Sequence, residues 1–395
     1  MSTHRKWAAA ILAISVVYAL SWWVVSTDAR PTMAEPALTA LSRIQFMLSL
    51  PLRVVATVIF GGIYMRHAHE VILGIAFLTP LFWLMGVRAV NTVQRARKRS
   101  SAVSERLPFR PDRRLFLATA TLGVLGTTGG AVGADAMLLA PQRVRVRSYT
   151  HRVPWLPGGA ETLRIAHVSD THLGQFVSRR FLEGVMTQVN ELSPDLVFLT
   201  GDYVHRHPSF IGDAIGILEM LRPRIGSMAV LGNHDHWEGA DACRDAFARV
   251  GIPLLDNERV FLSDRGLGKE APQTGGICIA GVGDLWEDAV DFGLALREVP
   301  EDMHRLVLSH NPDTALMTRD ERVDLMISGH THGGQVLLPV IGAPFVPSRH
   351  GDRFLGGECE GDGFPVIVSR GLGLAGVPVR FGVPPELGLI TLTRA

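Results

Sequence analysis

Residues that can bind metal ions or move protons recur in five short motifs between positions 170 and 334. In chain order the motifs are Asp170-Thr171-His172, Gly201-Asp202, Gly232-Asn233-His234-Asp235, Ser309-His310-Asn311-Pro312 and Gly329-His330-Thr331-His332-Gly333-Gly334. Carboxylate and amide oxygens and imidazole nitrogens are ligands that Mn, Fe and Zn all accept. No cysteine lies in these motifs, which disfavours a closed structural zinc site. One Asp-x-His pair alone says little, but the five motifs together predict a metal centre.

Each motif follows a short apolar run that has the length of a β-strand. Strands are expected at 144–149, 163–169, 196–200, 228–231, 277–282, 306–309, 325–328, 366–369 and 387–392. Helices are expected at 178–192, 208–221, 239–250 and 289–299, where apolar residues recur with a helical period. Alternating strands and helices, followed by a part that is mostly strands, indicate a layered α/β fold with the helices outside. Ligands bind at the carboxyl ends of the strands in such sheets, so we expect the motifs to meet there.

The order of the motifs, D-x-H, G-D, G-N-H-D, H and G-H-x-H, resembles the calcineurin-like metallophosphoesterases. The forms Ser169-Asp170-Thr171-His172-Leu173-Gly174 and Gly329-His330-Thr331-His332-Gly333-Gly334-Gln335 are similar to those of its bacterial membrane-associated branch. So is the tail, with Ser369-Arg370-Gly371-Leu372-Gly373, Pro378-Val379-Arg380-Phe381-Gly382 and Pro384-Pro385-Glu386. The resemblance covers about residues 144 to 393. It implies a four-layer αββα sandwich in a catalytic domain at 144–395.

The resemblance also implies a role for each motif residue. One metal would be held by Asp170, His172 and His332, the other by Asn233, His310 and His330, and Asp202 would bridge the two. His234 would face the substrate, and Asp235 would orient the His234 ring. Many members carry an acidic residue a few positions after the G-D pair, where this chain has His205. The nearby His205, His207 and His236 are expected to be solvent-facing or rim histidines.

These assignments predict direct hydrolysis of a phosphodiester or pyrophosphate bond. A hydroxide that bridges the two metals would attack phosphorus in line, since two metals lower the pKa of water from about 15.7 toward ~7. His234 would stabilise the developing charge or donate a proton to the leaving oxygen. The alternative from another class is a membrane scaffold or sensor that binds metal without catalysis. That alternative would be favoured by a missing ligand, and none is missing.

Residues 1–140 read as a transmembrane helical region with three or four spans. Apolar runs at 7–25, 44–65, 71–87 and 115–134 are the candidates, and a signal peptide is the competing interpretation of the first. The loop at 88–114 is rich in arginine and lysine, so the positive-inside rule places it in the cytoplasm. Arg113-Arg114 ahead of an apolar stretch also resembles a twin-arginine export signal. Both features predict an extracytoplasmic catalytic domain, on the periplasmic side of a bacterial inner membrane.

The sequence indicates the substrate less directly. The domain begins a few residues after the last apolar run, so it should lie near the bilayer. The apolar stretch 336–347 follows the last metal motif, and it is either a buried strand and turn or an exposed surface for a lipid tail. We expect a lipid-linked phosphoester such as a phospholipid or a UDP-diacylglucosamine-like compound. A net charge of +1 argues against nucleic acid, and the few charges in the apolar runs disfavour a transporter.

Overall fold

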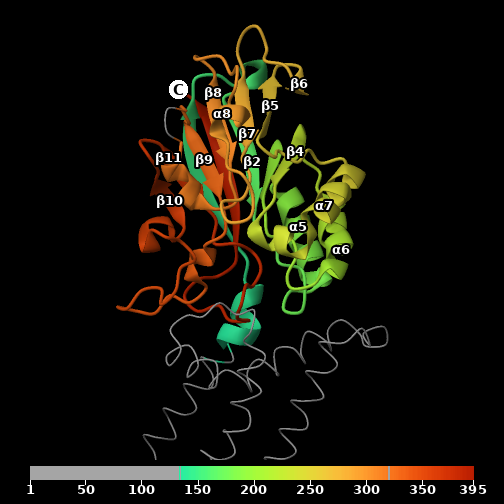
Figure 1. Cartoon of the computed structure of the whole chain (residues 1–395), viewed down its shortest axis with the longest axis vertical. Coiled ribbons are helices and arrows are strands. Elements are labelled where there is room, and N and C mark those ends of the chain that lie inside the picture. Colours follow the sequence, from blue (N-terminus) through green and yellow to red (C-terminus); the bar gives the residue numbers. More distant parts are fainter. Residues whose placement is uncertain (1–132, 134, 319–320) are drawn as a thin grey trace, which may run out of the picture. The chain divides into compact units, whose positions relative to one another are not determined.

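The computed structural model describes residue 133, residues 135–318 and residues 321–395. Apart from Gly133, the four candidate membrane segments lie outside these described residues, and so does the basic loop at 88–114. Within the described part, none of the helices is both long enough and apolar enough to cross a bilayer. The account below therefore concerns the unit Gly133–Ala395 (Figure 1).

Two β-sheets form the centre of this unit. The first has the order β1 (Arg145–Val153), β12 (Glu386–Arg394), β2 (Thr162–Val168), β3 (Leu196–Thr200) and β4 (Gly226–Val230). The second has the order β10 (Gly357–Glu360), β11 (Pro365–Val368), β9 (Leu325–Ser328), β8 (His304–Leu308), β7 (Ile277–Gly281), β5 (Glu258–Ser263) and β6 (Gly266–Gly268). The nine expected strands are all present, with ends shifted by a few residues. Strands β5, β6 and β10 were not expected.

The direction of the strands determines which loops meet. Strands β2, β3 and β4 are parallel, and in the second sheet β7, β8 and β9 are parallel as well. Strand β12 runs antiparallel to β2, and β1 runs parallel to β12. The chain therefore enters β1 at the same end of the sheet at which β2, β3 and β4 finish.

The two sheets pack face to face around one apolar core. That core combines side chains of the first sheet, such as Ile165 and Phe198, with side chains of the second, such as Leu306 and Ile327, all fully buried. A second apolar cluster covers the outer face of the second sheet and includes Phe292 and Phe354. The sheets are thus held by burial of apolar surface on both faces of the second sheet.

Helices cover the outer face of the first sheet, and Figure 1 shows α5, α6 and α7 grouped there. The α-helices are α5 (Arg179–Glu191), α6 (Ile211–Gly216), α7 (Asn233–Val250) and α8 (Phe292–Ala295). Helix α5 begins where Ser178 accepts a hydrogen bond from the Phe181 amide, and it buries a stripe with helical spacing: Leu182, Val185, Met186 and Val189. Short turns complete the fold: η3 (Asp135–Leu139), η4 (Ala140–Gln142), η5 (Pro157–Gly159), η6 (Pro208–Phe210), η7 (Ile217–Met220), η8 (Pro312–Leu316), η9 (His332–Gly334) and η10 (Gly351–Phe354).

Three expected helices differ from the structure. The one expected at 208–221 is broken into η6, α6 and η7, and the one at 289–299 shrinks to the four residues of α8. The one expected at 239–250 begins six residues earlier, at Asn233, and contains a kink at Gly239, whose φ is 136°. The helical layer on the second sheet is consequently thin, with α8 and 3-10 turns in place of the expected outer layer.

Candidate metal centre and active site

The five polar motifs lie together at the carboxyl ends of the central strands. Asp170 and Asp202 follow β2 and β3, and Asn233 is the first residue of α7 after β4. The second sheet contributes His310 after β8 and His330 after β9. Neighbouring motifs are bonded through the backbone: the Asp170 amide donates to the Gly201 carbonyl (3.0 Å) and the Gly329 amide to the His310 carbonyl (3.0 Å). The site therefore forms where the two sheets meet.

Many of the candidate ligands have an unusual backbone conformation. Five of the seven have a positive φ: Asp170 (53°), His172 (46°), Asp202 (58°), His330 (69°) and His332 (54°). Residues other than glycine seldom adopt this left-handed region, and such strain concentrates at functional sites.

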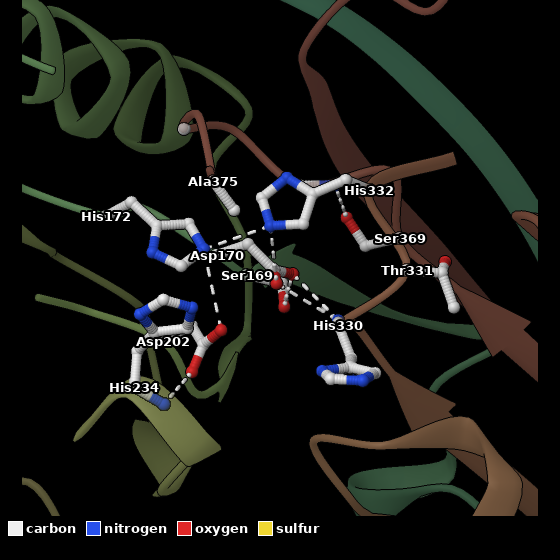
Figure 2. A network of polar contacts seen from close by, with 12 residues as sticks. Ser169, Asp170, His172, Asp202, His234, His330, Thr331, His332, Ser369 and Ala375 are labelled. Carbon is white, nitrogen blue, oxygen red and sulfur yellow. Dashed lines mark hydrogen bonds and ion pairs between the residues drawn. The ribbon is translucent and has the colours of Figure 1, made fainter. Parts of the chain in front are cut away.

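The first group of side chains that could hold a metal ion consists of Asp170, His172 and His332. The Nε2 atoms of His172 and His332 lie 2.9 Å apart, and His332 Nε2 lies 3.2 Å from Asp170 Oδ1. Figure 2 shows the three side chains pointing toward one another. All three are buried, so their polar atoms have little access to bulk water.

The second group consists of Asp202, His310 and His330. His330 Nδ1 lies 3.2 Å from His310 Nε2, which lies 3.3 Å from Asp202 Oδ2. The same Asp202 oxygen lies 3.5 Å from His172 Nε2 in the first group. Asp202 is thus placed between the groups, as a bridging carboxylate would be. His310 Nδ1 lies 2.7 Å from the Thr200 carbonyl, to which it donates, and this bond orients the ring with Nε2 toward the site.

The buried polar atoms of these residues fit bound cations. Asn233 Oδ1 and His330 Nε2 are buried and have no hydrogen-bond partner among the described residues, which is costly unless something else satisfies them. At Gly329, a Cβ atom would overlap Ser169 Oγ and Asp170 Oδ2, so only glycine allows the backbone to pass this close to the carboxylate. The donor set is carboxylate, amide and imidazole, which suits divalent Mn, Fe or Zn.

The charges of the site balance one another through close contact. Burial would raise the pKa of Asp170, but His332 and His310 outweigh it and hold that pKa below its usual range. Burial would likewise lower the pKa of His310, but Asp202 outweighs it and raises that pKa. Burial, followed by the charge of His310, lowers the pKa of His330 to about 3. Buried carboxylates that demand positive charge, beside a histidine that stays neutral, are what cation ligands require.

His234 lies beside the first group with its ring half-buried. Its ring meets that of His172 edge-on with centroids 4.8 Å apart, and its amide donates to Asp202 Oδ1 (2.9 Å). The sequence predicted a solvent-facing or rim position for His205, but the residue is buried and only 2% exposed. Its Nδ1 lies 3.3 Å from His234 Nδ1, and the ring centroids are 4.9 Å apart. His205 is therefore placed to fix the orientation of the His234 ring, which local sequence could not reveal. His207 and His236 are partly exposed.

Asp235 does not orient the His234 ring, which corrects the expectation from the motif. Its carboxylate is fully buried and accepts hydrogen bonds from the backbone amides of Asp202 (2.8 Å), Tyr203 (2.8 Å) and Gly232 (2.9 Å). Burial, followed by the charge of Asp202, raises the pKa of Asp235 to about 7. Asp235 thus ties the loop after β3 to the start of α7, and acts on the site through the backbone.

Two tryptophans and one arginine lie around the candidate site. The sequence analysis gave none of them a role in the site. Trp237 lies edge-on to His234 (4.5 Å between centroids) and Trp286 edge-on to His330 (4.5 Å). Arg380 is fully buried and donates to the carbonyls of a loop that packs on the ligands: Arg370, Gly371, Gly373 and Val383. Only the tail motif that contains Arg380 signalled its importance in the sequence.

The stretch 336–347 is exposed at its tip, so it is not the buried strand and turn that was one of its two interpretations. Val340 is 107% exposed, Ile341 75% and Phe345 71%. The stretch begins four residues after His332, a candidate ligand. Large apolar side chains therefore face solvent in the stretch that follows the last metal motif.

Comparison with known proteins agrees with this geometry. Residues 163–334 match the family model of the calcineurin-like phosphoesterases. The chain is 31% identical over 269 residues to the uncharacterized metallophosphoesterase YkuE of Bacillus subtilis (strain 168), which covers 67% of this chain and 91% of that protein. It is 30% identical over 247 residues to the phosphodiesterase YaeI of Escherichia coli (strain K12), covering 61% of this chain and 86% of that one.

A third relative matches a larger share of the chain. It is a transmembrane protein with metallophosphoesterase domain from Danio rerio, 29% identical over 331 residues, and the match covers 81% of this chain and 72% of that protein. The chain belongs to the calcineurin-like metallophosphoesterases, which confirms the resemblance, and it is a phosphoester hydrolase. The family uses divalent metal ions, in agreement with the two groups of His and Asp side chains.

Proposed function

We propose that this chain hydrolyses a phosphodiester or pyrophosphate bond of a lipid-linked substrate at a two-metal centre. The observation that carries this proposal is the convergence of Asp170, His172 and His332 with Asp202, His310 and His330 at the meeting point of two sheets. In this proposal residues 144–395 are the catalytic domain, and 1–140 anchor it in the membrane. Two relatives that are named transmembrane proteins support the anchor.

Seven side chains would hold the ions. Asp170, His172 and His332 would bind the first, and Asn233, His310 and His330 the second, with Asp202 between them. When bound, two divalent cations lower the pKa of water toward ~7 and neutralise charge on the phosphoryl oxygens. The unpaired Oδ1 of Asn233 and the position of Asp202 Oδ2 between both groups support this division of the ligands.

His234 would act on the substrate directly. Burial lowers its pKa, so its ring is largely neutral before a substrate arrives, and the negative phosphoryl group would raise that pKa again. With Nδ1 against His205, the other ring nitrogen would donate a hydrogen bond or a proton to an oxygen of the phosphoester. His205 would keep the ring in this orientation, and Asp235 would keep the underlying backbone in place.

The lipid preference and the membrane side rest on further features. The exposed apolar tip at Val340, Ile341 and Phe345 supports a substrate that lies in a lipid surface. The arginine-rich stretch at 88–114 supports a cytoplasmic loop there and hence a catalytic domain on the periplasmic side of the inner membrane. A phospholipid or a UDP-diacylglucosamine-like pyrophosphate fits these features.

The test is a phosphoester panel coupled to metal analysis of the purified full-length protein. We expect two equivalents of metal, and faster turnover of a lipid pyrophosphate or phospholipid than of bis-p-nitrophenyl phosphate. His234→Ala should lower kcat by about 10²–10⁴-fold with both metals retained, since that is the range for general acid catalysis. Asp202→Ala should lose metal and activity together, and the exposed His350→Ala is the matched control. Full turnover by His234→Ala would refute its role, and equal rates on the soluble ester would refute the lipid preference.

A further inference from the structure

Five large apolar side chains are exposed in two segments that are distant in the sequence. Leu138 (44% exposed) and Leu139 (54%) end the first turn of the unit, η3. Val340 (107%), Ile341 (75%) and Phe345 (71%) form the tip of the stretch 336–347. We call these five residues the apolar patch. Soluble proteins seldom expose this much apolar surface in one region without a partner for it.

The two segments are joined by backbone hydrogen bonds to a third. The Arg380 amide donates to the Ala136 carbonyl in η3 (2.9 Å), and the Leu337 amide donates to the Phe381 carbonyl (2.8 Å). Because Arg380 and Phe381 are consecutive, η3 and the base of the stretch lie on either side of the same piece of chain. Figure 1 shows η3 and an orange loop near residue 340 at the same end of the unit.

The metal-binding side chains lie at this same end of the unit. The chain enters β1 where β2 and β3 finish, so η3 and η4, which precede β1, lie on the side of Asp170 and Asp202. The stretch also packs against the chain next to His332. A Cβ atom on Gly334, two residues after His332, would lie 2.7 Å from the Ala343 Cβ, so the two backbones are close there. The apolar patch and the candidate active site therefore share one end of the catalytic unit.

The chemistry of the surrounding chain indicates what covers the patch. Residues 115–132, which lead directly into η3, contain no charged residue, and this run of apolar and small residues has the composition of a membrane span. Stretch 336–347 is free of charged residues too. In η3 the one charged residue, Asp135, is ion-paired with Arg143 (2.7 Å), and the exposed Arg145 and Arg349 follow the two segments. An apolar surface with basic residues at its margin matches an anionic lipid interface, and it follows a chain segment suited to bilayer insertion.

We propose that the apolar patch is a bilayer-docking surface, which holds the metal-site end of the catalytic unit against the lipid interface. The inference rests on the proposed function in one respect: it explains how a phosphoester group at the membrane surface reaches the metal site without leaving the lipid. Docking itself requires no catalysis, so the two ideas can fail separately.

The direct test places an environment-sensitive fluorophore on the patch. Cys243 and Cys278 are buried, so Ile341→Cys in a Cys359→Ser background gives one reactive thiol for NBD labelling of the full-length protein. The matched control is Arg265→Cys, an exposed position in the turn between β5 and β6, which lies at the opposite end of the second sheet from the metal groups. Both are reconstituted in vesicles of phosphatidylethanolamine and phosphatidylglycerol that contain a spin-labelled lipid.

A blue-shifted label at position 341 that lipid spin labels quench, beside an unshifted and unquenched label at 265, is the expected result. Equal, water-like emission at both positions would overturn the proposal. So would quenching at 341 by a second labelled copy of the chain but not by lipid, since the patch would then be a contact between copies.

An activity measurement separates this idea from the proposed function. In the Ile341→Ser/Phe345→Ser variant, we expect the apparent KM for a vesicle-borne phosphoester to rise at least about tenfold, because two apolar side chains no longer enter the lipid. Turnover of bis-p-nitrophenyl phosphate in solution should stay unchanged. An unchanged KM on vesicles would overturn the docking surface. An inactive wild-type protein whose label is embedded in lipid would refute the hydrolase reaction and leave the docking surface standing.

Discussion

The role of Asp235 can be tested by converting its carboxylate to an amide. Asp235→Asn keeps the shape of the side chain, but only one of its two terminal atoms can still accept hydrogen bonds. If the oxygen stays with the Asp202 and Gly232 amides, the Tyr203 amide, now bonded at 2.8 Å, loses its acceptor in the buried interior. An unsatisfied buried donor costs about 1–3 kcal/mol.

We therefore expect the free energy of unfolding to fall by about 2 kcal/mol, which lowers Tm by roughly 4–8 °C for a domain of this size. Thermal unfolding of the full-length protein in detergent, followed by circular dichroism, measures this. Asp241→Asn is the control: it makes the same exchange on the same helix, at a side chain that is 99% exposed, and should change the free energy by less than about 0.5 kcal/mol. A wild-type Tm combined with a large loss of kcat would refute our reasoning, because that is the result expected if Asp235 oriented the His234 ring.

Three further predictions follow from buried groups near and far from the site. His205→Phe keeps a ring beside His234 but removes the nitrogen contact, so kcat should fall at least about tenfold with KM and metal content little changed; unchanged kcat would contradict a positioning role. Burial lowers the pKa of His304 to about 4, so between pH 6.5 and 4 the unfolded chain takes up a proton that the folded chain does not. Stability is then full above pH 6.5 and is lost as the pH falls toward 4. The His304→Gln variant should lose about 1–2 kcal/mol less over this range in urea titrations, and parallel curves would show that His304 is not responsible. Arg380→Met leaves several buried carbonyls without a donor, and we expect about 3–5 kcal/mol of destabilisation, visible as a lower urea midpoint; an unchanged midpoint would contradict the structural role.

The sequence was sufficient to predict the metal-binding motifs and the strands that precede them. A buried strand in a parallel sheet reads as a continuous apolar run, and five of the runs here end at a polar motif, as Leu196–Thr200 ends at Gly201 and Asp202. Parallel strands must end at the same edge, so the meeting of these motifs follows from their order. The motifs alone therefore indicate the family and the candidate ligands.

The edge strands and the ends of the helices could not be predicted from the sequence in the same way. Strands β6 and β10 have the sequences GLG and GECE, which have no apolar pattern, and they exist because a neighbouring strand offers backbone hydrogen bonds. Helix α7 contains Gly239, which by itself favours a helix end, yet the Asp235 carboxylate and packing of the first turn extend the helix back to Asn233.

Only the tertiary structure decided which polar groups face one another and which apolar groups face water. His205 follows the Gly201-Asp202 motif by three residues, and Asp235 is the last residue of the motif that contains His234. Local sequence favours a solvent-facing or rim position for His205 and a contact with His234 for Asp235. Packing of the loop after β3 against the start of α7 reverses both assignments, because it buries His205 beside His234 and surrounds Asp235 with backbone amides. The stretch 336–347 has the apolar composition of a core segment, but Val340, Ile341 and Phe345 at its tip are exposed in the folded unit, which composition does not reveal.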